Sequence, residues 1–437
     1  MTVYNLKVWL IGWALFLCVF QGNWLSTAGA QAIDNGTPAP AKYLAASQAK
    51  PASALGDRVS PAISSVLPVQ VAAGDDRLQY FGRWDHSLPG QVRTGRGAVY
   101  VKANFTGSSL AVELEDKSSW WRYSIDGQAF KRFQPEQRAV RGAVLLAEKL
   151  PAGRHHLLLA RETEGNVGLS TIKGWRLAPG GTLLAGDRVS GRRLEFVGDS
   201  IMAGAFAYGP GPYTEQENGY MAYGPQLARL LNADWSVVAK SGEGVVRNYL
   251  EGTAAGQGTA AAKQPTAEKK QTAGSALSKA AEKIKTGPVV HARENYLRTL
   301  FTEPKPLWKN QAFAPQLILV SYGSNDFSEN YEVEKARYVQ GYVRLLQTIR
   351  KKNPRARIVC LEPVPYTTNR QAGYWAHLAV QERQAEGDEL VYYWTVNRPR
   401  PCLEASDFAG DEEHPLIKGH TKLARYLKDK VARLLGW

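Results

Sequence analysis

A serine directly follows a short apolar segment in Phe196-Val197-Gly198-Asp199-Ser200. The apolar residues predict a strand, and the small residues at 202–205 predict the start of a helix. Ser200 is therefore expected at the carboxyl end of a strand, where open α/β sheets bind their ligands. The unpaired N–H groups of the helix N-terminus favour an anion that forms there. This arrangement suits nucleophilic attack on a carbonyl carbon, although Gly-Asp-Ser alone occurs in many loops.

Two further segments carry hydrogen-bond donors behind predicted strands. In residues 238–244, Gly242 is the expected backbone N–H donor to an oxyanion, with Gly244 as the alternative. A plain turn glycine without a catalytic role fits that segment equally well. Asn325 ends a second segment of this kind and can donate its side-chain amide. Asp326 beside it is expected to cap the next turn or to brace the loop.

A histidine precedes the last predicted helix in Asp411-Glu412-Glu413-His414-Pro415. A histidine can take the proton of a serine and return it to the leaving group. Asp411 lies three residues upstream and can reach the other ring nitrogen, which fixes the tautomer. The chain has seven histidines, of which His377 and His420 are the competing candidates.

The second half of the chain alternates predicted strands with amphipathic helices. The predicted strands are Leu194–Val197, Ser236–Ala239, Leu317–Ser321, Arg357–Leu361 and Val391–Val396. Val339–Arg350 and Thr421–Leu435 repeat apolar residues at helical spacing. This alternation predicts a flavodoxin-like α/β domain, with a parallel sheet and helices on both faces. The catalytic candidates would then gather at the carboxyl edge of that sheet.

The first half of the chain reads as short strands between residues 73 and 185. The predicted strands are Leu78–Trp84, Ala98–Phe105, Leu110–Glu115, Trp121–Ile125, Ala143–Leu150, His156–Arg161 and Ile172–Leu177. Several of them alternate apolar and polar residues, and Asp126-Gly127 is a hairpin signal. The pattern predicts an antiparallel β-sandwich of the jelly-roll kind, separate from the α/β domain at 186–437.

The N-terminal segment has the pattern of a secretory signal peptide. Lys7 precedes an apolar run from Val8 to Phe20, and small residues follow up to Ala32. The run is short for a membrane-spanning helix, although an uncleaved anchor is the alternative. We expect residues 1–32 to be removed and the mature protein to be secreted or periplasmic, without stable membrane insertion.

Two segments have the composition of unstructured chain. Residues 33–72 are rich in Ala, Pro, Ser and Gln and read as a linker. Residues 252–287 contain almost no bulky apolar side chain and predict a disordered insertion; a docking helix near 275–285 is the alternative. Cys360 and Cys402 follow the signal segment, and either a disulfide or two free thiols fits them.

Composition limits the partners. The net charge of +14 fits either solubility or attraction to an acidic polymer. There is no nucleic-acid motif and no basic stripe interleaved with aromatics, so nucleic acid is not an expected partner. No metal-ligand cluster or phosphate-binding glycine loop stands out, so we expect neither a metal nor a nucleotide cofactor. The protein is expected to be a monomer.

The order of the four segments resembles that of the SGNH (GDSL-type) hydrolase family, over residues 190–437. In that family a serine attacks an ester, and the resemblance implies this role for Ser200. It also implies that the backbone N–H of Ser200, the N–H of Gly242 and the amide of Asn325 hold the oxyanion. Asp411 and His414 would complete the triad.

The sandwich ahead of this domain resembles carbohydrate esterase family 2, which removes acetyl groups from xylan and glucomannan. The stretches Asn295–Arg298 and Gly323–Phe327 are also similar to that family. Two features depart from it. Members often orient the histidine with a backbone carbonyl, whereas Asp411 is present here, and the insertion at 252–287 is unlike a compact member. The resemblance implies polysaccharide deacetylation through an acetyl-Ser200 intermediate.

Other functions fit the same residues. One is removal or transfer of acetyl groups on peptidoglycan or another bacterial surface glycan. Another is a carbohydrate-binding protein whose α/β half is inactive. Trp375 is expected in a loop after the fourth strand and in contact with substrate, and Trp120-Trp121 could form a sugar platform. Core packing is the alternative for each tryptophan.

Overall fold

The computed structural model describes residues 67–139, 142–252, 289–309, 313–328, 331–364, 366–411 and 413–437. The predicted signal peptide, nearly all of the predicted linker and residues 253–287 of the predicted insertion lie outside the described residues. All of the described residues belong to one compact unit, within 56–437.

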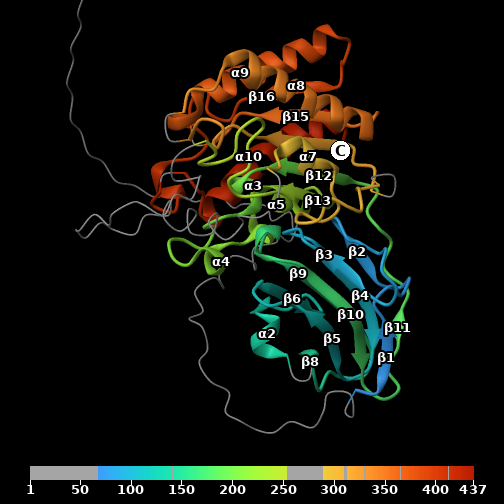
Figure 1. The fold of residues 1–437 in the computed structure, drawn as a ribbon. Helices are drawn as coiled ribbons and strands as arrows, with labels where there is room; N and C mark the ends of the chain where they lie inside the picture. The colour runs from blue at the N-terminus through green and yellow to red at the C-terminus, as the bar shows by residue number, and fades with distance from the viewer. Residues whose placement is uncertain are drawn as a thin grey trace, which may run out of the picture. The chain divides into compact units, whose positions relative to one another are not determined.

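The N-terminal half consists of two antiparallel sheets, as the sequence predicts (Figure 1). The first has the order β1-β10-β5-β8, with β3 paired to β10; its strands are β1 (Val69–Ala72), β10 (Ser170–Leu177), β5 (Leu110–Glu115), β8 (Val144–Ala147) and β3 (Val92–Thr94). The second has the order β11-β4-β9-β6-β7, with β2 paired to β4; its strands are β11 (Leu183–Leu184), β4 (Tyr100–Thr106), β9 (Arg154–Arg161), β6 (Trp121–Ile125), β7 (Lys131–Phe133) and β2 (Gln79–Phe81). A short helix, α2 (Pro135–Arg138), follows β7.

Residues of both sheets fill one buried core. The alternating residues of β4 and β5 enter it as their period of two predicts, among them Val101, Phe105 and Val112. Trp121 is fully buried in this core. The guanidinium of Arg132 lies 3.9 Å from the ring centre of Trp120 and covers that ring. Core packing, the alternative, therefore holds for Trp121, so the two rings do not form a joint sugar platform.

The C-terminal half has a five-stranded parallel sheet in the order β13-β12-β14-β15-β16. Its strands are β12 (Arg193–Gly198), β13 (Asp234–Ala239), β14 (Leu317–Ser321), β15 (Arg357–Leu361) and β16 (Val391–Trp394). The first strand, β12, lies between the second and the third, so the strand order reverses beside it. That reversal is the point at which open α/β sheets bind ligands.

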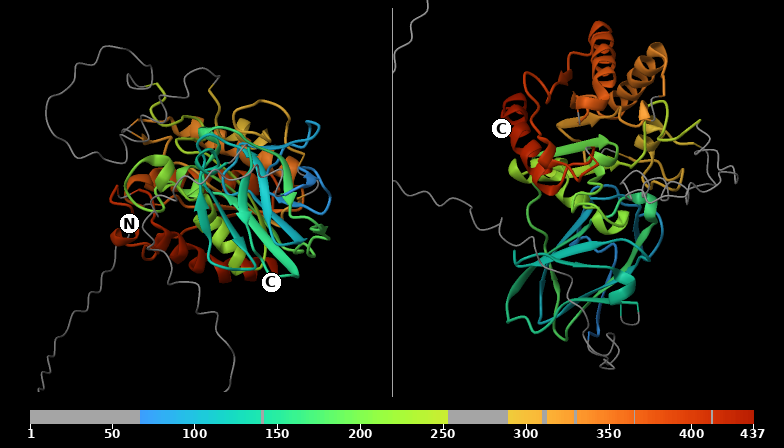
Figure 2. Two further views of the ribbon diagram at one scale, coloured as in Figure 1. Left: turned by 90° about the horizontal axis from the view of Figure 1, so that it is seen from below. Right: turned by 90° about the vertical axis from the view of Figure 1, so that its left-hand side faces the viewer.

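Helices cover both faces of the parallel sheet, as predicted. One buried cluster packs α5 (Tyr223–Leu230) and α10 (Ile417–Leu435) on one face, and another packs α7 (Ala292–Leu297), α8 (Lys335–Lys352) and α9 (Tyr366–Ala385) on the other. In Figure 2 the red α10 and the orange α8 and α9 lie on opposite sides of the sheet. Neighbouring residues of one strand enter different clusters, Phe196 the first and Val197 the second.

Short elements complete the connections after β12 and before α10. They are α3 (Ser200–Ala203), α4 (Tyr213–Gln216), η2 (Gly219–Met221) and η5 (Ala405–Asp407). Cys360 and Cys402 are free thiols that pack in different clusters. Of the two alternatives for this pair, a disulfide or two free thiols, the structure has the free thiols. None of the described helices combines the length and apolar character that a membrane crossing requires.

Sandwich residues and α/β residues share a buried contact surface. The ring of Tyr100 stacks on Trp235 at 4.1 Å between centroids, and its hydroxyl donates to Asp234 at 2.9 Å. Arg83 is fully buried and pairs with the buried Glu195 at 3.2 Å. Its guanidinium also donates to the carbonyl oxygens of Tyr296 and Arg298. The charge of Glu195 is thus balanced by a residue from the other half of the chain.

Replacing Arg83 with Met is expected to destabilise the fold by about 3–5 kcal/mol, because Glu195 loses its buried counter-charge. The double variant Arg83→Met/Glu195→Gln should recover part of that loss. Arg77→Met is the matched control, since the Arg77 side chain is 44% exposed. Urea unfolding measures the difference. Equal unfolding midpoints for Arg83→Met and wild type would contradict this account of the contact surface.

Candidate active site

Ser200 lies where the sequence predicts it, at the turn from β12 into α3. Asp199 is the N-cap residue, and its carboxylate accepts the N–H of Ile201 at 3.1 Å. A side chain at Gly198 would lie 2.9 Å from the carbonyl oxygen of Ser321, so the close approach of β12 and β14 requires glycine. Ser200 is 6% exposed and occupies the first position of the helix, where its N–H has no partner within the helix.

The structure brings Ser200, His414 and Asp411 together in one hydrogen-bonded line. His414 Nε2 lies 2.9 Å from Ser200 Oγ, and His414 Nδ1 lies 2.6 Å from Asp411 Oδ2. The other carboxylate oxygen of Asp411 accepts the N–H groups of Glu413 and His414 at 3.0 and 2.9 Å. Two backbone bonds therefore hold Asp411, and Asp411 holds the imidazole with Nε2 facing the serine.

Opposing effects set the pKa of His414. Burial lowers it, but the hydrogen bond and the negative charge of Asp411 outweigh burial, so the net pKa lies above the ordinary value of a histidine. Burial raises the pKa of Asp411, and the contact with His414 outweighs that effect and lowers it overall. The pair therefore favours a charged imidazole, the species that forms when His414 takes a proton from Ser200.

The two predicted oxyanion donors follow the strands that flank β12. Gly198 is aligned with Ala239 of β13 and with Ser321 of β14. The segments that follow these three residues therefore leave the sheet at the same edge. Gly242 has φ +75°, a conformation that favours glycine. Asn325 Nδ2 donates to the carbonyl oxygen of Glu243 at 2.9 Å, which leaves its second N–H for a ligand.

Gly244, the alternative donor, has a structural role. Its N–H donates to Asn248 Oδ1 at 3.1 Å. A side chain there would lie 1.9 Å from the carbonyl oxygen of Arg247, so the position requires glycine for packing. Because the N–H of Gly244 already has Asn248 as its partner, Gly242 stays the candidate donor.

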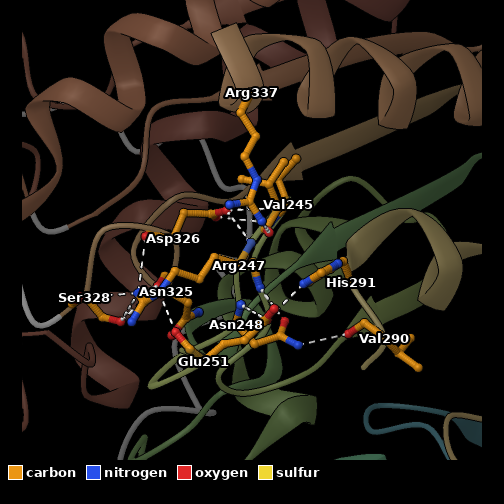
Figure 3. A network of polar contacts seen from close by, with 12 residues as sticks. Val245, Arg247, Asn248, Glu251, Val290, His291, Asn325, Asp326, Ser328 and Arg337 are labelled. Carbon is orange, nitrogen blue, oxygen red and sulfur yellow. Dashed lines mark hydrogen bonds and ion pairs between the residues drawn. The ribbon is translucent and has the colours of Figure 1, made fainter. Parts of the chain in front are cut away.

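Asp326 braces the loop after β13, which is one of the two roles predicted for it. Its carboxylate accepts the N–H groups of Val245, Val246 and Arg247 at 3.0, 2.8 and 3.2 Å (Figure 3). Arg247 donates in return to the carbonyl oxygen of Asn325 at 3.2 Å. Burial raises the pKa of Asp326 to about 6, against the effect of the three N–H groups. The segments that carry the two predicted oxyanion donors are thus tied to each other.

The flanks of the undescribed residues 253–288 lie against the same loop. Asn248 Nδ2 donates to the carbonyl oxygen of Val290 at 3.2 Å, and His291 Nε2 lies 2.9 Å from Glu251 Oε2 (Figure 3). The carboxylate of Glu251 also accepts the N–H of Asn248 at 2.8 Å. These contacts hold both flanks beside the braced loop.

The competing histidines have other surroundings. The ring of His377 stacks on Tyr393 at 4.6 Å between centroids. His420 is fully buried, and burial lowers its pKa to about 3. Its Nδ1 accepts the N–H of Tyr223 at 3.3 Å. His414 is the histidine that the structure places on Ser200.

The predicted loop position of Trp375 is wrong. Trp375 lies in α9, not in a loop, and is 8% exposed. It packs against Phe327 and Tyr338, at 5.4 and 6.0 Å between ring centroids. The helix was missed because its buried face consists mainly of small residues such as Ala372 and Ala379, which give a weak amphipathic pattern.

The structure also gives a role to Glu243, which the sequence did not predict, although Glu243 lies in the segment 238–244. Its side chain is fully buried and accepts the amide of Asn295 at 2.9 Å and the hydroxyl of Tyr322 at 2.8 Å. Burial raises its pKa. A glutamate beside two glycines reads as a solvent-exposed loop residue, so the sequence held no signal for this role. Among the described residues, no group of three or more His, Cys, Asp or Glu side chains is arranged to hold a metal ion.

Two family models match the two halves of this chain. Residues 194–427 match the family model of GDSL-like Lipase/Acylhydrolase, and residues 80–186 match that of the Carbohydrate esterase 2 N-terminal domain. The chain is 28% identical to Cellulase/esterase CelE of Acetivibrio thermocellus over 372 residues, which are 82% of this chain and 40% of that protein. It is 29% identical to an acetylxylan esterase / glucomannan deacetylase of Cellvibrio japonicus over 280 residues, which are 60% of this chain and 66% of that protein.

The chain thus spans less than two thirds of the length of these two relatives. Among solved structures, it is similar to a family two carbohydrate esterase from Clostridium thermocellum in complex with cellohexaose. The TM-score is 0.67 at 26% identity, over 82% of this chain and 99% of that chain.

Asp411→Asn is expected to lower kcat/KM for an aryl acetate by about 10²–10⁴-fold, because an amide no longer fixes the tautomer of His414. The base must be neutral, so activity rises with pH through the pKa of His414. Since Asp411 raises that pKa and burial lowers it, the acidic limb of the pH–rate profile should move to lower pH in this variant. Asp429→Asn, on an exposed position of α10, is the control. An unmoved acidic limb would contradict the role of Asp411.

Asn325→Ala is expected to lower kcat by about 10²–10³-fold with a much smaller change in KM, because an oxyanion donor acts mainly in the transition state. Steady-state kinetics on an aryl acetate measures both constants. Gln340→Ala removes an exposed amide of α8 and serves as the control. A change confined to KM would mean that Asn325 binds the ground state instead.

Proposed function

Because this chain belongs to the GDSL-like lipase/acylhydrolase family and carries a carbohydrate esterase 2 N-terminal domain, we propose that it removes O-acetyl groups from a polysaccharide of the xylan or glucomannan class. It is a carboxylic ester hydrolase with Ser200 as nucleophile. The observation that carries this proposal is the contact of His414 Nε2 with Ser200 Oγ at 2.9 Å, where Ser200 is the first residue of α3. The name of the Cellvibrio japonicus relative supports the choice of substrate class.

In the first half-reaction Ser200 Oγ attacks the acetyl carbonyl carbon while His414 Nε2 takes the hydroxyl proton. The carbonyl oxygen becomes an oxyanion, which accepts hydrogen bonds from the N–H of Ser200, the N–H of Gly242 and the amide of Asn325. The tetrahedral intermediate then collapses, and the bond to the sugar oxygen breaks. That oxygen takes the proton from His414, and acetyl-Ser200 remains.

In the second half-reaction a water molecule attacks the acetyl-Ser200 carbonyl carbon and gives its proton to His414. The same three donors hold the second oxyanion. Collapse breaks the bond to Ser200 Oγ, which recovers its proton from His414, and acetate leaves. Throughout both halves Asp411 stabilises the imidazolium and keeps its orientation, without taking a proton itself.

The site of action is part of this proposal. We infer export from the signal-peptide pattern at 1–32, which lies outside the described residues. The net charge of +14 would favour contact with acidic polysaccharide chains or an anionic cell surface. The intact line Ser200–His414–Asp411 speaks against an inactive carbohydrate-binding protein.

Acetate release from a panel of substrates tests the proposed function. We expect release from acetylated xylan and glucomannan and from a short-chain aryl acetate, and little from O-acetylated peptidoglycan. Ser200→Ala should lose activity on every substrate, on the order of 10⁶-fold as in serine proteases that lose this hydroxyl. Release from peptidoglycan alone, or acetyl transfer to added sugar in place of acetate, would contradict the proposed substrate and reaction.

A further inference from the structure

Residues 162–165, which follow β9 in the sandwich, also contact the α/β half. The carbonyl oxygen of Glu162 accepts the N–H of Gly219 at 2.8 Å. The N–H of Glu164 donates to the carboxyl group of Glu217 at 2.7 Å. A side chain at Gly165 would lie 1.7 Å from the carbonyl oxygen of Gly95, so no larger residue fits there. This segment is therefore fixed from both sides.

The carboxylate of Glu164 reaches the oxyanion segment directly. Glu164 is fully buried, and its Oε2 accepts the backbone N–H of Ser241 at 2.6 Å. Ser241 immediately precedes Gly242, the proposed donor to the oxyanion. A residue of the sandwich thus holds the backbone at the point where the chain enters the left-handed turn of Gly242.

Tyr213 connects Glu164 with His414. Its hydroxyl hydrogen-bonds both the carboxylate of Glu164 and the hydroxyl of Ser241. Its ring packs edge-on against Phe206 at 5.3 Å, and Phe206 contacts the ring of His414 at 5.3 Å between centroids. One buried carboxylate therefore supports the oxyanion segment and, through two rings, the general base.

A second sandwich residue holds the far side of Gly242. Arg96 is fully buried and donates to Asn295 Oδ1 at 2.6 Å. Asn295 Nδ2 in turn donates to the carboxylate of Glu243 at 2.9 Å. Gly242 thus lies between two residues, Ser241 and Glu243, that are each held by the sandwich.

We propose that the sandwich is a working part of the oxyanion site, with Glu164 as its principal positioning residue and Arg96 acting through Asn295. These contacts keep the N–H of Gly242 aimed at the charge that forms during acyl transfer. A domain that serves only to bind glycan has no need of them. This inference rests on the proposed function in one respect: the wild-type protein must hydrolyse an ester, so that its kcat can be compared with that of the variants.

Glu164→Ala tests the proposal in the full chain, with an aryl acetate as substrate. We expect kcat to fall by about 10–100-fold and KM to change less than threefold, because a misplaced oxyanion donor acts on the transition state. Glu164→Gln keeps an acceptor oxygen for the N–H of Ser241 and should restore most of kcat. Tyr213→Phe keeps the ring packing and should lower kcat about threefold to tenfold, an independent test that does not depend on removing the carboxylate.

Glu162→Ala is the matched control for Glu164→Ala. Glu162 is also fully buried, two residues from Glu164, and pairs with Arg122 and Arg132 at 2.6 and 2.5 Å. We expect this variant to lower stability and to leave kcat within threefold of wild type. A kcat loss in Glu162→Ala equal to that in Glu164→Ala would overturn the proposal, because removing any buried carboxylate of this segment would then have the same effect. Unchanged kcat in both Glu164→Ala and Tyr213→Phe would overturn it as well. A wild type that hydrolyses no ester would instead overturn the proposed function.

Discussion

The alignment of three strand ends at Gly198 is the constraint on which the site depends. Because β12 pairs with β13 and β14 in register, the residues that follow Gly198, Ala239 and Ser321 emerge together at one edge of the sheet. The nucleophile comes from the central strand, and the proposed oxyanion donors come from its two neighbours. A one-residue shift of either pairing would turn the side chains of that strand to the opposite face and separate the donors from Ser200.

Strand alignment brings the segments together, but buried carboxylates hold them in place. Asp326 accepts three consecutive N–H groups of the loop after β13, and Glu164 accepts the N–H of Ser241. Such charge-assisted bonds to the backbone are stronger than neutral ones and also satisfy N–H groups that water cannot reach. Burial, the leading influence, raises the pKa of Asp199 to about 7 and that of Asp326 to about 6. The surroundings of Ser200 thus combine low polarity with fixed dipoles, which is the environment in which an oxyanion is stabilised most.

Much of this architecture could be predicted from the sequence, because its signals are local. The strands β5, β6, β14 and β15 have the predicted bounds. Ser200, Asn325 and His414 lie after a strand or before a helix, as the sequence segments that contain them predict. The rest depends on contacts between distant residues. Glu164 and Ser241 are 77 positions apart, and nothing in the local sequence around Glu164 marks it as part of the site. For Trp375 the residue type suggested a sugar contact. Its position on a helix face of small residues places it in the core instead.

The most direct test of the central claim is a crystal structure of the protein after reaction with an alkyl phosphonate ester, which mimics the tetrahedral intermediate. We expect a phosphorus–oxygen bond to Ser200 Oγ. One phosphonyl oxygen should lie within hydrogen-bond distance of the N–H of Ser200, the N–H of Gly242 and the amide of Asn325, with His414 beside the leaving-group position. An adduct on another residue, or a phosphonyl oxygen directed away from Gly242 and Asn325, would contradict it.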